Sequence, residues 1–217
     1  RFSTCAVVGN GGIHLAYRDG AAIDAHEAVF RFNAGPTRGF EAHVGSRTTI
    51  RLVNREHVSF REEGRGEEMR LQHVTTKQTL AAFVKARKEQ PALFALDPAF
   101  YQYILSKYSA GRTTRYYKGS GKSKVVQAMP TNGYFGVKLA LQLCDTVTVY
   151  GFIRAWRGYV PYHYFDNVTT VTNQQARDNR EFPLLLRLAE ELHPQAIRFA
   201  YSCVGGCGAG GEGKGDE

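Results

Sequence analysis

The segment Cys5-Ala-Val-Val-Gly-Asn-Gly-Gly12 decides the fold class of this chain. Its first half is an apolar run that is too short for a helix, and its second half is a cluster of glycines around one asparagine. This pattern is typical of a buried strand that ends in a tight turn. A strand that feeds a glycine turn predicts an α/β unit as the first element of the fold.

Further along the chain, strand candidates alternate with helix candidates. The strand candidates are residues 28–32, 48–53 and 146–150. The helix candidates are residues 78–88, the stretch after Pro130 in which Val137, Ala140, Leu141 and Cys144 share one helical face, and residues 182–192. This alternation predicts an α/β fold with a mostly parallel sheet and helices on both faces. We expect one domain over residues 1–203 and a flexible glycine-rich tail over residues 204–217.

The charge of the chain favours anionic partners. The 28 lysines and arginines exceed the 20 aspartates and glutamates, so the formal net charge is +8, which favours phosphates, nucleotides, nucleic acid or membrane surfaces. The most basic stretch, residues 107–124, interleaves tyrosines as single-stranded nucleic-acid platforms do. Glycine and serine punctuate it as in a solvated loop, and no nucleic-acid-binding motif accompanies it. We therefore interpret it, like residues 61–70, as a solvated surface segment and expect no nucleic-acid partner.

Neither a membrane span nor a metal site is expected within these residues. No window approaches the roughly eighteen consecutive apolar residues of a transmembrane helix. The chain begins with Arg1 and no apolar signal segment precedes Cys5, so any targeting segment lies upstream or has been removed. Cys203 and Cys207 form the one close cysteine pair, and a metal site would need two more ligands at suitable spacing.

The glycine turn after the first strand is a candidate ligand site. Gly9-x-Gly11 resembles the start of a dinucleotide fingerprint, but His14 occupies the position of the third glycine, which disfavours an NAD-dependent dehydrogenase. A glycine turn at the carboxyl end of a strand still lets the backbone approach a nucleotide. Two interpretations of Asn10 stay open: a hydrogen bond to a phosphate or ribose, or tolerance of a left-handed turn conformation.

A second candidate site lies where Thr131-Asn132-Gly133 opens a helix. The unpaired N–H groups and the positive end of the helix macrodipole bind anions there without any lysine. Plain capping of the helix is the alternative interpretation. Two such turns in one α/β sheet favour a ligand that carries a phosphate or a carboxylate.

Three groups of residues resemble the sialyl motifs of the eukaryotic sialyltransferase family. The large motif is matched by residues 5–12, 23–26, 29–36, 39–41 and 44–51. The small motif is matched by residues 130–133, 140–145 and 149–152, and the third motif by His163-Tyr-Phe-Asp166. The motifs stand in the family's order and cover most of residues 3–57 and 125–166.

The resemblance implies a Golgi type II membrane glycosyltransferase, anchored through a segment upstream of this chain. It implies transfer of sialic acid from CMP-sialic acid to a glycan hydroxyl on a glycoprotein or glycolipid, with inversion and without a metal or cofactor. The implied fold is a Rossmann-like variant of the glycosyltransferase A architecture, with the donor across the strand ends. The donor-binding residues that it carries over are Asn10, Asn33, Thr131, Asn132, Gly133 and Gly151. Sequences of this kind also occur in plants and algae, which makes CMP-Kdo an alternative donor.

The same resemblance implies a disulfide between Cys5 and Cys144. Such a bond requires an oxidising lumen. Asn167-Val168-Thr169 is a glycosylation sequon that is consistent with this compartment.

The chain departs from the family at its last motif, which supplies a histidine as general base and a glutamate five residues later. The best-matching segment has Arg180 and Leu185 in these places. Arginine stays protonated and cannot act as a base. His163 is the candidate substitute, with a packed core histidine as its alternative interpretation, and Arg180 is suited to pair with the donor's carboxylate or phosphate. The large motif also has His43 where the family has aspartate, which puts local packing or polar pairing in question.

Taken together, these residues predict a sialyltransferase-like enzyme with the catalytic candidates His163 and Arg180. The alternative is a catalytically impaired relative that binds a CMP-sugar or a glycan without efficient turnover.

Overall fold

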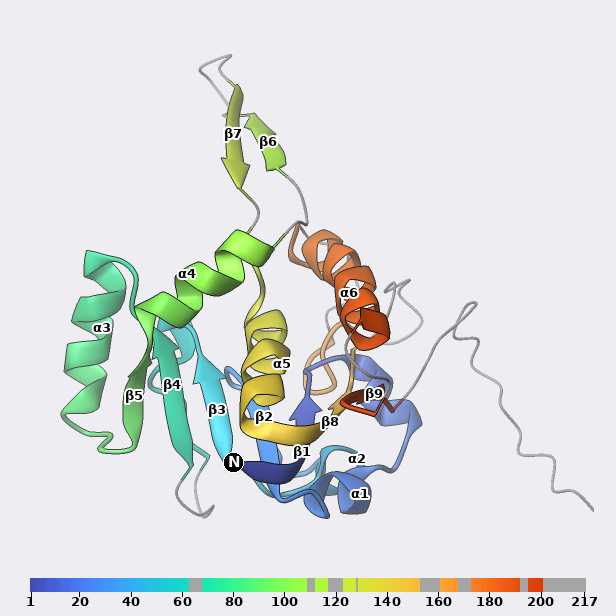
Figure 1. Ribbon diagram of the computed structural model, residues 1–217. Helices are drawn as coiled ribbons and strands as arrows, with labels where there is room; N and C mark the ends of the chain where they lie inside the picture. Colours follow the sequence, from blue (N-terminus) through green and yellow to red (C-terminus); the bar gives the residue numbers. More distant parts are fainter. Residues whose placement is uncertain are drawn as a thin grey trace, which may run out of the picture.

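The computed structural model describes residues 1–62, 68–108, 112–116, 123–127, 129–152, 161–167, 173–191 and 195–200 (Figure 1). For residues 112–116, 123–127 and 173–180 it describes the backbone alone. Cys203, Cys207 and the predicted tail over residues 204–217 lie outside the described residues, so the expected domain boundary stays a prediction.

A seven-stranded sheet with the order β5-β4-β3-β2-β1-β8-β9 forms the centre of the fold. All neighbouring strands in it pair in parallel. The strands are β1 (Phe2–Val8), β2 (Ala28–Phe32), β3 (Ile50–Val53), β4 (Met69–His73), β5 (Leu93–Leu96), β8 (Cys144–Tyr150) and β9 (Ile197–Phe199). The predicted α/β class with a parallel sheet is therefore confirmed.

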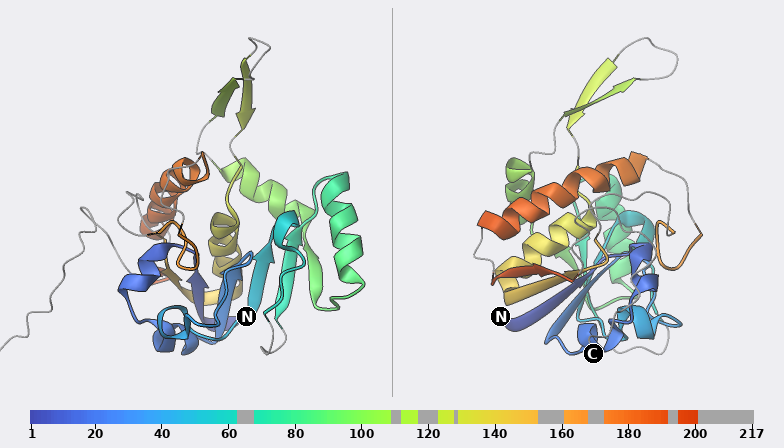
Figure 2. Two further views of the ribbon diagram at one scale, coloured as in Figure 1. Left: turned by 180° about the vertical axis from the view of Figure 1, so that it is seen from behind. Right: turned by 90° about the vertical axis from the view of Figure 1, so that its right-hand side faces the viewer.

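Helices cover both faces of this sheet, as expected (Figure 2). The helices are α1 (Gly20–Asp24), α2 (Glu41–Val44), α3 (Lys77–Arg87), α4 (Pro98–Lys107), α5 (Asn132–Leu143) and α6 (Asn173–Glu191), with 3-10 turns η1 (Gly12–Ala16) and η2 (Arg55–His57). Successive residues of β1 point to opposite faces, so Cys5 and Val7 pack into the core under α4, α5 and α6, while Ala6 and Val8 pack into the core beside η1, α1 and α2.

The prediction that residues 61–70 form a solvated surface segment is wrong for the last residues of this range. Strand β4 begins at Met69, and Arg70 is buried. Glu68 contacts two buried guanidinium groups, with its Oε1 2.8 Å from Arg51 Nε and 3.3 Å from Arg70 Nε. Because these pairs compensate the buried charge, a charged sequence is compatible with an inner strand, which hydropathy alone does not indicate.

The sequence pattern did not predict β5, α4 and β9 either. Helix α4 nevertheless carries an ordinary start signal, since the Asp97 carboxylate accepts the Ala99 N–H at 2.8 Å and Pro98 occupies the first turn. Helix α6 begins earlier than the predicted 182–192. Cys144 is the first residue of β8 and not the last turn of the preceding helix.

The predicted surface loop over residues 107–124 is also wrong, because it contains part of a hairpin. Strands β6 (Arg112–Tyr116) and β7 (Ser123–Gln127) pair antiparallel, with Arg115 opposite Lys124. The hairpin projects away from the sheet, beyond α4 and α5 (Figures 1 and 2). The β-branched residues Thr113, Thr114, Val125 and Val126 favour strands, although the surrounding charge and glycine content resemble those of a loop.

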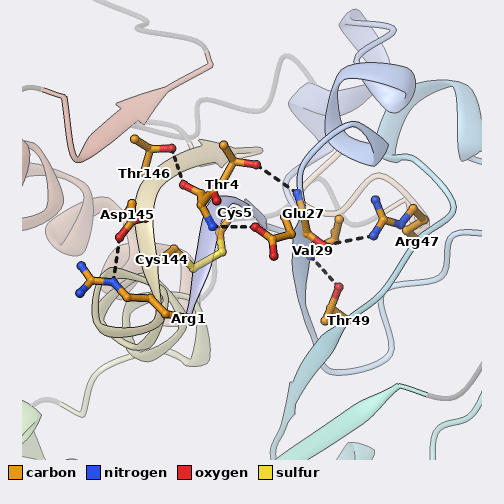
Figure 3. The surroundings of a disulfide bond; sticks show 11 residues. Arg1, Thr4, Cys5, Glu27, Val29, Arg47, Thr49, Cys144, Asp145 and Thr146 are labelled. Atoms are coloured by element: carbon orange, nitrogen blue, oxygen red, sulfur yellow. Dashed lines mark hydrogen bonds and ion pairs between the residues drawn. A yellow bond between two sulfur atoms is a disulfide. The ribbon is translucent and has the colours of Figure 1, made fainter.

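Cys5 and Cys144 form a disulfide, which confirms the predicted pair. The bond joins β1 to the start of β8, with the two Cα atoms 6.1 Å apart (Figure 3). Polar contacts surround it: Arg1 Nε lies 2.7 Å from Asp145 Oδ1, and Ser3 N donates to Glu27 Oε2 at 2.7 Å. None of the helices in the part of the chain that the structure describes combines the length and the apolar character needed to cross a bilayer.

Candidate functional site

A cavity of about 640 Å³ opens at the carboxyl ends of four central strands. Strand β1 lies between β2 and β8, so successive connections leave it in opposite directions along the sheet. In open α/β sheets, ligands bind in the crevice that this reversal of strand order creates. The described lining residues that follow these strands are Gly9, Asn10 and Gly11 after β1, Asn33 and Ala34 after β2, Asn54 and His57 after β3, and Gly151 and Phe152 after β8.

The glycine turn is tight because two chain segments touch there. A side chain on Gly11 would lie 2.4 Å from the carbonyl oxygen of Gly151, and Gly151 itself has φ +75°. His14 contacts the backbone of the turn, since its Nε2 lies 3.0 Å from the Gly9 carbonyl oxygen. Burial lowers the pKa of His14 to about 4, so the ring is neutral at neutral pH and donates this hydrogen bond.

Asn10 does not adopt the left-handed conformation that was one of its two interpretations. Among the described residues, the non-glycine residue with positive φ is Asn33, at 51°. The Asn10 side chain lies in the cavity wall, and its Nδ2 donates to the Phe32 carbonyl at 3.3 Å. Asn10 therefore joins the ends of β1 and β2, and its donor-binding role stays a prediction.

Asn33 connects three of the segments that line the cavity. Its Oδ1 accepts hydrogen bonds from Asn132 Nδ2 and from the Asn54 N–H, both at 3.0 Å. The left-handed backbone at Asn33 aims the side chain at both partners, and asparagine tolerates this conformation better than most residues. The end of β2, the end of β3 and the start of α5 are thereby held together.

The segment Pro130–Gly133 opens α5 at the cavity wall, as the resemblance implied. Thr131 caps the helix, because its Oγ1 accepts the Tyr134 N–H at 3.1 Å. The capping interpretation is therefore correct for this side chain. The first helical N–H groups, those of Asn132 and Gly133, have no hydrogen-bond partner among the described residues, and such groups at the positive end of a helix bind anions.

His163 lies in the cavity wall and forms an ion-pair geometry with Asp166. Its Nδ1 is 2.5 Å from Asp166 Oδ2, and both side chains are 31% exposed. The imidazole stacks on Phe165, with ring centroids 4.9 Å apart and an interplanar angle of 4°. A half-exposed ring at a cavity contradicts the packed-core interpretation. The contact with Asp166 occupies Nδ1 and leaves Nε2 for other partners, and the catalytic role of His163 stays a prediction.

Glu181 is a carboxylate in the cavity wall that the sequence analysis missed. It is 4% exposed, and it accepts the Thr131 N–H at 2.7 Å and the Thr131 hydroxyl at 2.5 Å. Asn54, His57 and Asp166 were missed as well. A polar residue directly after a parallel strand was a signal for Asn54, whereas nothing in the local pattern distinguishes Glu181 from the other acidic residues of α6.

The structure describes the side chains of some of the remaining predicted residues and not of others. The side chain of Arg180 lies outside the described residues, so its predicted role is untested. Leu185 is buried at the cavity and provides no carboxylate. Asn167 is exposed, as a glycosylation site requires. His43 finds local partners, since its Nδ1 lies 2.5 Å from the Tyr17 carbonyl oxygen and 3.1 Å from that of His14.

The described part of the cavity wall holds two histidines and two carboxylates, and no lysine or arginine. In the same described residues, no group of three or more histidines, cysteines or acidic residues is arranged to hold a metal ion. The polar groups that this part of the cavity offers to an anion are therefore backbone N–H groups, amides and imidazoles.

A parallel sheet with a glycine turn and a helix N-terminus around one switch-point cavity is the arrangement found in many nucleotide-binding α/β proteins. The chain belongs to glycosyltransferase family 29 (sialyltransferase), whose family model matches residues 1–193. It is 34% identical over 179 residues to the CMP-N-acetylneuraminate-beta-galactosamide-alpha-2,3-sialyltransferase 1 of Mus musculus, covering 75% of this chain and 48% of that protein. It is 29% identical over 185 residues to the beta-galactoside alpha-2,6-sialyltransferase 2 of Xenopus tropicalis, covering 76% of this chain and 34% of that protein.

Solved structures show the same similarity. A mammalian sialyltransferase in complex with Gal-beta-1-3GalNAc-ortho-nitrophenol matches with a TM-score of 0.67 and 27% identity, over 91% of this chain and 69% of that one. The sialyltransferase CstII from Campylobacter jejuni, in complex with cytidine-5'-monophosphate, shares the fold with a TM-score of 0.55 and 14% identity, over 91% of this chain and 79% of that one. The chain spans about half or less of the length of the curated relatives named above.

Proposed function

We propose that this chain is the catalytic part of a glycosyltransferase that moves sialic acid, or a related keto-sugar acid such as Kdo, from a CMP-sugar to a glycan hydroxyl. Membership of the sialyltransferase family supports the reaction class. The observation that carries the proposal is the His163–Asp166 pair in the same cavity as the glycine turn and the start of α5. A proton acceptor and an anion site are the two features that this transfer requires.

The donor nucleotide lies across the strand ends, between the turn at residues 9–12 and the start of α5. The N–H groups of Asn132 and Gly133 bind its phosphate, where the dipole of a twelve-residue helix favours negative charge. Asn33 fixes the side chain of Asn132 beside them. Asn10 and Gly151 contact the nucleoside, and Gly11 leaves room for the backbone to approach it. In this proposal, the residues with a predicted donor-binding role bind the donor inside the cavity.

The chemical step is a displacement at the anomeric carbon of the donor. The acceptor hydroxyl oxygen forms the new bond to this carbon on the face opposite the phosphate, and the bond from the carbon to the phosphate oxygen breaks. Its electron pair leaves with CMP. The hydroxyl proton passes to Nε2 of His163, while Asp166 stabilises the imidazolium that forms. Inversion follows from the single displacement, and the step uses no metal.

The proposal also includes the compartment and the partners. A disulfide joins Cys5 to Cys144, which favours an oxidising lumen such as that of the Golgi. Asn167 is exposed in a sequon and accepts a glycan there. The membrane anchor belongs to a segment upstream of Arg1, and the acceptor is a glycan on a glycoprotein or glycolipid.

The test is acceptor-dependent release of CMP from CMP-sialic acid and from CMP-Kdo. We expect Asp166→Asn to lower kcat by about 10²-fold and His163→Gln by 10² to 10⁴-fold, roughly the range of general-base catalysis, with little change in CMP affinity. A matched control is Asp145→Asn, which removes an exposed carboxylate near the disulfide. Nucleotide binding without any turnover, in the wild type as in the variants, would instead identify a catalytically impaired relative.

A further inference from the structure

The buried carboxylate of Glu181 forms hydrogen bonds with two residues, Tyr108 and Thr131, that lie far from it in the sequence. Tyr108 donates its hydroxyl to Glu181 Oε1 at 2.8 Å. The same oxygen accepts the Thr131 N–H at 2.7 Å, and Oε2 accepts the Thr131 hydroxyl at 2.5 Å. Tyr108 and Glu181 are 7% and 4% exposed, so these hydrogen bonds form in a largely dry environment in which they are strong.

The two partners of Glu181 flank the hairpin. Tyr108 is the C-cap of α4, directly before the excursion that contains β6 and β7, and Thr131 is the N-cap of α5, directly after it (Figure 1). Helix α6, which carries Glu181, lies beside both positions through these hydrogen bonds. Glu181 therefore holds together the residue before the hairpin segment and the residue after it. It thereby fixes the position at which the chain enters α5.

This arrangement determines which groups remain for a ligand at the start of α5. Glu181 takes the Thr131 N–H and hydroxyl, and Thr131 Oγ1 in turn accepts the Tyr134 N–H. The next two N–H groups, of Asn132 and Gly133, have no hydrogen-bond partner among the described residues. A carboxylate at this place would by its charge alone oppose a phosphate, so its benefit to donor binding is one of geometry.

We infer that Glu181 is a positioning residue, which holds the turn at residues 130–133 so that the N–H groups of Asn132 and Gly133 bind the donor phosphate. The inference rests on the proposed function and adds a residue that the predicted site does not include. It separates two contributions of one side chain: the hydrogen bonds orient the turn, and the negative charge weakens anion binding slightly. An amide at this position keeps the first contribution and removes the second.

The test compares CMP with cytidine by calorimetry on the purified chain, because cytidine lacks the phosphate. Glu181→Leu is expected to lower the affinity for CMP by about tenfold, which corresponds to the loss of one well-formed hydrogen-bonded contact, and to leave the affinity for cytidine within about twofold. Glu181→Gln, which retains an acceptor for Tyr108 and for the Thr131 N–H, is expected to bind CMP as tightly as the wild type or more tightly. In the transfer assay, the leucine variant raises the KM for the donor more than it lowers kcat.

Two further variants provide a second test of the hydrogen bonds and a control for the helix. Tyr108→Phe removes one hydrogen bond to Glu181 without touching the cavity wall and is expected to reduce CMP affinity by about threefold; it replaces the leucine variant if that variant does not fold. Glu190→Gln, at an exposed position on the same helix, serves as the matched control and leaves both affinities unchanged.

The outcomes separate the inference from the proposed function. If the wild type binds neither CMP nor a CMP-sugar, the proposed function fails. If the wild type binds CMP but Glu181→Leu and Tyr108→Phe bind it equally well, the positioning role fails alone. Equal losses for CMP and cytidine would show a general structural role, and tighter CMP binding by both the leucine and the glutamine variants would show that the carboxylate acts by charge only; either result overturns the inference.

Discussion

Asn132 donates a side-chain hydrogen bond to Asn33 at 3.0 Å, across 99 residues of sequence. Asn33 directly follows β2 and Asn132 is the first residue of α5, so this bond joins the two halves of the cavity wall. The residues that resemble the large and the small sialyl motif meet at this contact. The proposed donor site is therefore one structural unit, although its residues lie far apart in the sequence.

Replacing Asn33 is expected to affect stability and nucleotide binding together. Asn33→Ala removes the acceptor for Asn132 Nδ2 and the Asn54 N–H and places a Cβ-bearing residue with no local hydrogen bond at φ 51°. We expect the free energy of unfolding to fall by about 2–3 kcal/mol, measured by denaturant titration. CMP affinity should fall by about tenfold, because Asn132 loses its orientation.

The matched variant is Asn33→Gly, which loses the same hydrogen bonds but accepts the left-handed backbone. It should be more stable than the alanine variant by about 1 kcal/mol and bind CMP equally weakly. Wild-type CMP affinity in both variants would refute the role of this contact.

Opening the disulfide is expected to destabilise the domain strongly. Cys5 and Cys144 are separated by 139 residues, so their bond restricts a large part of the unfolded chain. The variant Cys5→Ala/Cys144→Ala should lose about 3–5 kcal/mol of unfolding free energy. Thermal unfolding of the wild type with and without a reductant is the companion measurement, and equal melting temperatures would contradict the prediction.

Stability is expected to decline below neutral pH because of His14. Burial lowers the pKa of His14 from 6.5 to about 4. The unfolded chain therefore binds a proton at a pH where the folded chain does not, and the free energy of unfolding falls as the pH drops from 6.5 toward 4. The slope is about 1.4 kcal/mol per pH unit, for a total on the order of 3 kcal/mol. Burial also lowers the pKa of His73 to about 4, which adds a loss of the same sign.

Denaturant titrations at several pH values check this expectation. His14→Gln keeps a donor for the Gly9 carbonyl but does not titrate, so its stability should fall less steeply below pH 6.5 than that of the wild type. Parallel curves for the two proteins would rule out His14 as a source of the pH dependence.

The stability of the fold should depend on the ion pair between Glu68 and the buried guanidinium of Arg51. Arg51 Nε lies 2.8 and 2.9 Å from the two carboxylate oxygens of Glu68, and the Arg51 side chain is fully buried. Glu68→Gln removes the carboxylate that contacts both Arg51 and Arg70 and leaves Arg51 the longer ion pair with Glu62, at 4.0 Å. It should cost about 3 kcal/mol of unfolding free energy. The control is Glu56→Gln in the exposed pair with Arg55, where a change below about 1 kcal/mol is expected. Similar effects of the two substitutions would contradict this account.

Local patterns predicted those parts of the fold in which hydrophobic residues and turns coincide. The first strand with its glycine turn, the strand at residues 28–32 and the helix after Pro130 all follow this rule. Strands β4 and β5 did not, because β4 carries Arg70 and Gln72 into the core and only its tertiary partners make that burial possible. The hairpin was missed because its charge resembles that of a solvated loop.

The sequence by itself determined the family, the fold class and the cysteine pair, since these depend on ordered motifs and on the period of the hydrophobic pattern. Only the tertiary structure placed Glu181 on Thr131 and Tyr108. The reason is physical: hydrophobic burial is nearly independent of partner identity and leaves a trace along the chain, whereas a hydrogen bond depends on direction within a few tenths of an ångström and is set by segments that meet only after folding.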